Sequence, residues 1–141
     1  MTIDRSVIER LVPHTGAMCF LDSVMHWDAH SISCSAPAPD ESHPFLRSDK
    51  VPATAAAEYA AQATALHGAL LDATATPRAG MLSKLSDVEL HRAWFPNNER
   101  RLSVQATLIS RTLGGCLYTF DVNSAHQPIA TGRLMVVFTP A

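Results

Sequence analysis

The feature that most limits how this chain can fold is an alanine-rich segment near its middle. Residues 53–71 contain no proline and, apart from Gly68, no glycine, and alanine is the most frequent residue among them. Because alanine has the highest helix propensity of all residues, the segment is predicted to form one long helix. Its apolar side chains occupy nearly the whole circumference of that helix. Such a helix is stable only when other elements bury most of its surface.

The segments on either side of this helix have the alternation and the turn residues of β-strands. Residues 2–12 are predicted to form a short amphipathic helix, and the proline-rich and charged segment 37–52 a long loop. Strands are predicted at residues 18–28, 31–36, 80–95, 101–110, 116–123 and 129–138. The last four are expected to follow one another in sequential antiparallel order. The prediction is an α+β fold, a single domain over residues 1–141, in which a curved antiparallel sheet surrounds one central helix.

Composition excludes several classes of function. The 141 residues carry 11 basic and 13 acidic side chains, a formal charge of -2, and no basic run that would follow a nucleic-acid backbone. No apolar run is long enough for a membrane span, and the charged N-terminus does not resemble a secretory signal. Cys19, Cys34 and Cys116 lack the spacing of a metal site, so we expect buried free thiols and a cytoplasmic protein.

Glu58 is the one acidic residue within the predicted helix. A carboxylate among small apolar side chains is costly to bury unless it has a partner or a chemical role. One interpretation is that Glu58 reaches solvent or pairs with a cation such as Arg47. The other is that it belongs to an active site near the positive end of the helix.

Two motifs carry a resemblance to a known family. LVPHTGAMCFLDSV (residues 11–24) and HPFLRSDKVPATAAAEYAAQA (residues 43–63) are similar to the hot-dog fold dehydratases that act on 3-hydroxyacyl groups held on acyl carrier protein. Pro13-His14 matches the family's opening motif, and the run from Glu58 to Gln62 matches its helix motif E-x-x-AQ. The similarity is greater still to a divergent branch associated with aryl-polyene and xanthomonadin-type pigments.

The resemblance implies roles for individual residues. Glu58 would act as the acid and His43 as the base, with His14 either the alternative base or a structural residue of the first turn. Pro52, Ala53 and Gln62 are the predicted substrate-binding residues; Pro52 and Ala53 would bind the thioester at the helix N-terminus, and Gln62 would order the neighbouring loop. The family needs no metal and no organic cofactor. It also implies a homodimer or a heterodimer with a related dehydratase subunit, with acyl carrier protein as the substrate-bearing partner.

The sequence also departs from the family pattern. The sequence VPA replaces MPG at residues 51–53, the FPG that follows the family histidine is missing, and His43 lies one residue further from Pro52 than that histidine does. Glycines at these places normally let backbone amides approach the thioester closely. Two alternatives therefore stay open: a hot-dog acyl thioesterase, or a non-catalytic subunit that pairs with a complete dehydratase.

Overall fold

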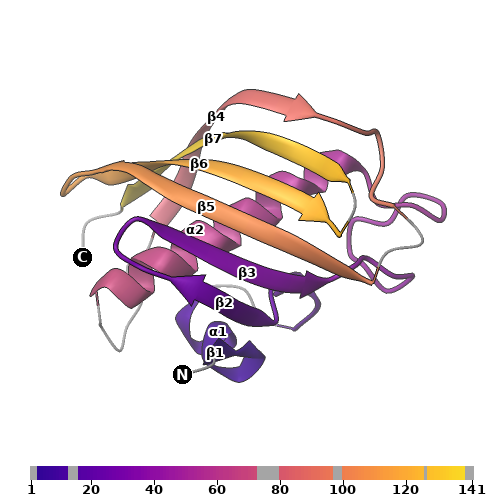
Figure 1. Cartoon of the computed structure of the whole chain (residues 1–141), viewed down its shortest axis with the longest axis horizontal. Coiled ribbons are helices and arrows are strands. Elements are labelled where there is room, and N and C mark those ends of the chain that lie inside the picture. The colour runs from indigo at the N-terminus through magenta and orange to yellow at the C-terminus, as the bar shows by residue number, and fades with distance from the viewer. Residues whose placement is uncertain (1–2, 13–15, 73–79, 97–99, 126, 139–141) are drawn as a thin grey trace.

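The computed structural model describes residues 3–12, 16–72, 80–96, 100–125 and 127–138 (Figure 1). The elements follow in the order β1 (Ile3–Asp4), α1 (Arg5–Leu11), the 3-10 turn η1 (Gly16–Met18), β2 (Ser23–Trp27), β3 (Ser31–Pro37), the 3-10 turn η2 (Ala53–Ala55), α2 (Ala56–Asp72), β4 (Gly80–Leu90), β5 (Arg101–Arg111), β6 (Gly115–Ser124) and β7 (Pro128–Phe138).

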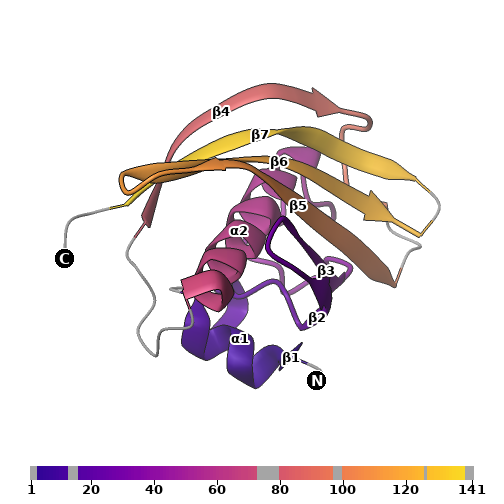
Figure 2. The same cartoon turned by 60° about the vertical axis from the view of Figure 1, so that its left-hand side comes forward.

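The strands form one seven-stranded sheet in the order β1-β2-β3-β5-β6-β7-β4. Every neighbouring pair is antiparallel. The sheet curves over α2, and α1 lies below the same helix (Figures 1 and 2). The expected sequential order of the last four strands is wrong for β4, which pairs with β7 at the sheet edge rather than with β5. The chain thus passes from α2 to the far edge of the sheet before β5 continues beside β3.

The long helix forms the centre of the core, as its composition predicts. Tyr59, Ala60, Ala63 and Leu66 are all buried, and α2 packs against β3, β5 and β6. The sheet side of this core comes from alternate residues of each strand, as in β5, where Leu102, Val104 and Ala106 are buried between exposed neighbours. The side-chain period of two places these residues on the face that covers the helix.

Several element boundaries differ from the predicted ones for local reasons. The helical segment begins as the 3-10 turn η2 and continues as α2 to Asp72. The first helix begins only at Arg5, because the Asp4 side chain accepts a hydrogen bond from the Val7 amide and caps the helix. Strand β2 is shorter than predicted, since Cys19 and Phe20 precede it as an irregular segment. Strand β4 ends at Leu90, before the predicted end.

Two expectations from composition can be compared with the described residues. None of the three cysteines, all of which lie in the described ranges, forms a disulfide; Cys19 and Cys34 are buried as expected, whereas Cys116 is only partly buried. Within the described ranges, neither helix combines the length and the apolar character that crossing a bilayer requires.

Candidate active site

A cavity of about 410 Å³ lies between α2 and the sheet. The side of α2 that lines it carries mainly small residues, among them Ala61, Ala65 and Gly68, and the opposite wall includes Tyr118 and Phe138. A Cβ atom built on Gly68 would meet no atom within 4 Å, so this part of the cavity is open. The cavity extends along most of α2, from its first turn to its last residue.

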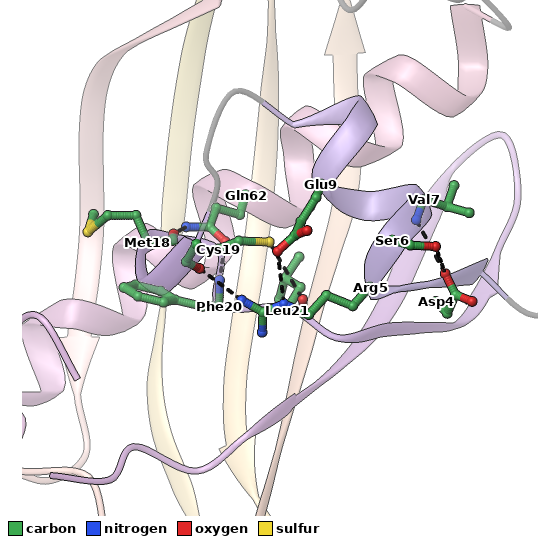
Figure 3. A network of polar contacts seen from close by, with 11 residues as sticks. Asp4, Arg5, Ser6, Val7, Glu9, Met18, Cys19, Phe20, Leu21 and Gln62 are labelled. Carbon is green, nitrogen blue, oxygen red and sulfur yellow. Dashed lines mark hydrogen bonds and ion pairs between the residues drawn. The ribbon is translucent and has the colours of Figure 1, made fainter. Parts of the chain in front are cut away.

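Glu58 lines one end of this cavity and is held there by Gln62, one turn further along α2. The Nε2 atom of Gln62 donates hydrogen bonds to Oε1 of Glu58 (3.2 Å) and to the carbonyl oxygen of Met18 (2.7 Å). Its Oε1 atom accepts from the amide of Phe20 at 2.9 Å. Figure 3 shows Gln62 reaching from α2 to Met18 and Phe20. The Gln62 side chain, which is only 1% exposed, therefore fixes both the residue 18–20 segment and the Glu58 carboxylate.

His43 lies in the loop before α2, and both of its ring nitrogens have partners. The Phe45 amide donates to Nδ1 at 3.1 Å, and Nε2 lies 3.0 Å from the hydroxyl of Tyr59. Since Nδ1 accepts a hydrogen bond, the proton of the neutral ring is on Nε2, which donates to Tyr59. In this tautomer Nδ1 is the only acceptor nitrogen, so its hydrogen bond from the Phe45 amide must open before His43 can accept a proton there.

Aromatic rings surround the His43 imidazole. The ring centroid of Phe20 lies 4.6 Å from that of His43 and 4.6 Å from that of Tyr59. Burial lowers the pKa of His43, and Asp40 opposes this shift only in part. Burial also raises the pKa of the Tyr59 hydroxyl. At neutral pH the pair is therefore an uncharged imidazole and an uncharged phenol.

Glu58 and His43 line two different hollows of the described structure. His43 and Tyr59 line a separate depression of about 200 Å³, together with Phe20 and residues of the loop before η2. Glu58 and Tyr59 are consecutive in α2, where successive side chains point about 100° apart. The two predicted reacting groups thus lie on different sides of the same helix.

The remaining predicted site residues lie in different settings. Pro52 is the N-cap residue of η2 and forms an isolated bridge with Trp94. Ala53 is buried, and its amide donates to the carbonyl oxygen of Ala93 at 2.9 Å, so this amide already has a partner within the chain. His14 lies outside the described residues.

His67, which no sequence motif singles out, is fully buried in α2. Its Nε2 lies 2.7 Å from the carbonyl oxygen of Asp28, and its Nδ1 lies 2.6 Å from the hydroxyl of Tyr118. A carbonyl only accepts, so Nε2 donates to it and Nδ1 accepts from Tyr118. The sequence does contain a signal for these contacts. A histidine in a helix that is apolar all round is expected to be buried, and a buried polar side chain needs hydrogen-bond partners.

A second missed feature lies at the other end of the cavity from Glu58. Asp72, the last residue of α2, forms an ion pair with Arg111, the last residue of β5, and both residues line the cavity. The sequence contains no motif that pairs these two positions. Among the described residues, no cluster of three or more histidine, cysteine or acidic side chains is arranged to hold a metal ion.

Comparison with known proteins assigns the chain to a family. The family model of ApeP-like proteins, described as ApeP dehydratase, matches residues 6–141. Among solved structures, the chain is similar to the dehydratase heterocomplex ApeI:P from Xenorhabdus doucetiae, with a TM-score of 0.84 and 22% identity over 94% of this chain and 91% of that chain. A comparison with functionally curated proteins found no significant match.

Other solved structures share the fold at lower sequence identity. AziG from S. sahachiroi has a TM-score of 0.68 and 11% identity, over 94% of this chain and 100% of that chain. A hypothetical thioesterase with coenzyme A, from Streptococcus pneumoniae TIGR4, has a TM-score of 0.63 and 9% identity, over 82% of this chain and 84% of that chain. The seven-stranded sheet around one helix is therefore the hot-dog fold that the sequence predicts.

Proposed function

The chain belongs to the ApeP-like family of dehydratases, and from that premise we propose that it removes water from a 3-hydroxyacyl thioester held on acyl carrier protein. The product would be the trans-2-enoyl thioester. The observation that carries this proposal is the position of Glu58, a carboxylate fixed by Gln62 at one end of a largely apolar cavity. An acyl chain would bind in such a cavity because moving its methylene groups from water into apolar surroundings is favourable.

The reaction needs two proton transfers. A base removes a proton from the carbon next to the thioester carbonyl, and an acid protonates the hydroxyl group that leaves as water. We assign the acid to Glu58 and the base to His43, whose lowered pKa keeps it neutral and able to accept a proton at Nδ1 once the hydrogen bond from the Phe45 amide opens. His14 remains the alternative base. The first turn of α2 supplies the positive dipole end that would stabilise the developing enolate.

The separation of His43 from Glu58 within one chain supports an assembly in which two subunits complete each site. Strand β4 lies at the sheet edge and is exposed at every residue except the partly buried Ser86; its exposed apolar residues include Met81, Leu85 and Val88. A long, apolar edge strand of this kind is suited to pairing with another chain. The partner is a second copy or a related dehydratase subunit, and the dehydratase heterocomplex from Xenorhabdus doucetiae supports the second choice.

Two other functions have a specific observation in their favour. The fold similarity to a hypothetical thioesterase supports hydrolysis, in which water would attack the thioester near the same carboxylate. The engagement of both His43 nitrogens supports a subunit that contributes Glu58 and the cavity while its partner supplies the base. Cysteines that form no disulfide agree with a reducing compartment, so we propose the cytoplasm as the location.

Product analysis distinguishes these functions. Purified protein is incubated with 3-hydroxyacyl groups on acyl carrier protein, first alone and then with a related dehydratase subunit, and intact carrier is weighed by mass spectrometry. Loss of one water with the thioester retained supports dehydration. Release of the free carrier thiol supports hydrolysis, and activity that appears only with the second subunit supports the role of a partner. No change in either mixture contradicts the proposed function.

A further inference from the structure

We propose that the ion pair between Arg111 and Asp72 is the distal wall of the acyl site and sets the longest chain that the protein accepts. The inference rests on the proposed function, because it takes the cavity beside Glu58 to be the place of the acyl chain. It assigns a specificity-determining role to two residues that do not touch the reacting atoms.

The position of the pair supports this role. Glu58 and Asp72 are 14 residues apart in α2 (72 minus 58), so about 21 Å of helix separates the reacting end of the cavity from the ion pair. Both residues of the pair line the cavity. Their side chains are only 24% and 19% exposed, for Arg111 and Asp72 respectively. The guanidinium carbon of Arg111 also lies 5.8 Å from the ring centroid of Phe138, which lines the same cavity.

The cavity changes in character between its two ends. Along α2 its wall consists of small residues such as Ala61, Ala65 and Gly68, which leave room for a chain. In its distal half Tyr118 is held by the hydrogen bond of its hydroxyl to His67, and His67 is tied in turn to the Asp28 carbonyl. An acyl chain therefore meets a fixed polar wall after an apolar passage.

This change has a direct effect on binding. Each methylene group that leaves water for the apolar part of the cavity increases affinity about fourfold, the equivalent of roughly 0.8 kcal/mol. A methylene group that reaches the pair instead displaces water from two partly buried charges and offers them no hydrogen bond. We therefore expect the affinity to rise with chain length and then to stop rising at one defined length.

The test measures dissociation constants of the assembled protein for 3-hydroxyacyl pantetheine thioesters of increasing saturated chain length. The variant Arg111→Ala with Asp72→Ala removes the wall without leaving one charge unpaired. The matched control is Arg101→Ala with Asp22→Ala, because Arg101 is the first residue of β5 and pairs with Asp22 at 2.5 Å outside the cavity. If the alanine variant does not fold, Arg111→Met with Asp72→Leu removes the charges while retaining volume.

For the wild type and the control variant, we expect the affinity to stop rising at one chain length. For the variant without the ion pair, we expect the affinity to rise about fourfold with each methylene group added beyond that chain length. The same plateau in the folded variants without the pair would overturn the inference and leave the proposed function intact. A wild-type protein that binds no member of the series would overturn both.

Discussion

The Nε2 atom of His43 lies 3.0 Å from the hydroxyl of Tyr59, the residue that directly follows Glu58 in α2. With Nδ1 bound to the Phe45 amide, this contact places the ring proton on Nε2. The helix thus carries the proposed acid on one side and the partner of the proposed base on another.

The first prediction concerns the identity of the base. If His43 is the base, His43→Ala should lower the dehydration rate by roughly 100-fold to 10,000-fold, because the proton next to the carbonyl loses its acceptor. Folded His14→Ala should retain most of the activity. The measurement is the initial rate of enoyl formation, after circular dichroism and light scattering have verified folding and assembly. An inactive His14→Ala beside a fully active His43→Ala would assign the base to His14.

The second prediction concerns Gln62. Gln62→Met retains an unbranched side chain of similar length but leaves the Met18 carbonyl and the Phe20 amide without their partner. We expect the free energy of unfolding to fall by about 1–3 kcal/mol for each buried group left unsatisfied. Urea denaturation measures this loss, and Gln105→Met on the exposed face of β5 is the matched control. Equal stability of the two variants would show that Gln62 does not hold the residue 18–20 segment.

The third prediction concerns pH. Burial lowers the pKa of both His43 and His67 in the folded protein, so the unfolded chain binds protons more readily. Stability contributed by these groups is complete above the unfolded pKa of about 6.5 and is lost as pH falls below it. We therefore expect the free energy of unfolding, measured by urea denaturation, to fall between about pH 7.5 and pH 5.5. Aspartate side chains ordinarily titrate below this range, so they contribute little to the change. His67→Gln should make the dependence shallower, and an equally steep dependence in that variant would contradict the assignment.

The fourth prediction concerns assembly through β4. Leu85→Arg places a charge at the middle of the exposed edge strand and should weaken assembly, because the charge would lose water on pairing. Leu113→Arg is the control, since Leu113 is 93% exposed in the turn between β5 and β6. Light scattering across a concentration series measures the effect. A wild type that stays monomeric at micromolar concentration, alone and with a related subunit, would contradict the proposed assembly.

Local patterns were sufficient to predict the fold class, a curved sheet around one central helix, but not the order of all its strands. The alanine content of α2 predicts a helix, and the alternation of apolar and polar residues in β5 predicts a strand. Both signals can be recognised within a short segment, because helix propensity and the two-residue period of strand side chains are local properties. The placement of β4 beside β7 could not be predicted in this way. It depends on how the chain crosses the sheet after α2, and the sequence of β4 suits an edge or an interior position equally well.

The candidate site was predictable to a smaller extent. Glu58 and Gln62 stand out because they are the polar residues of one motif in an apolar helix, and the structure joins them by a hydrogen bond. The contacts of His43 with Tyr59 and of Asp72 with Arg111 depend on the three-dimensional path of the loop and of β5. Neither pair has a spacing that identifies it in the sequence. The roles of all six predicted site residues in the reaction stay predictions: Glu58, His43, His14, Pro52, Ala53 and Gln62.

The measurement that tests the central claim most directly is the rate of enoyl formation by Glu58→Gln. Glutamine retains the shape of the side chain and its acceptor for the Gln62 amide, but it has no acidic proton to transfer to the leaving hydroxyl. We predict an assembled, folded variant whose dehydration rate is lower by roughly 100-fold to 10,000-fold. Dehydration at the wild-type rate by this variant would contradict the account.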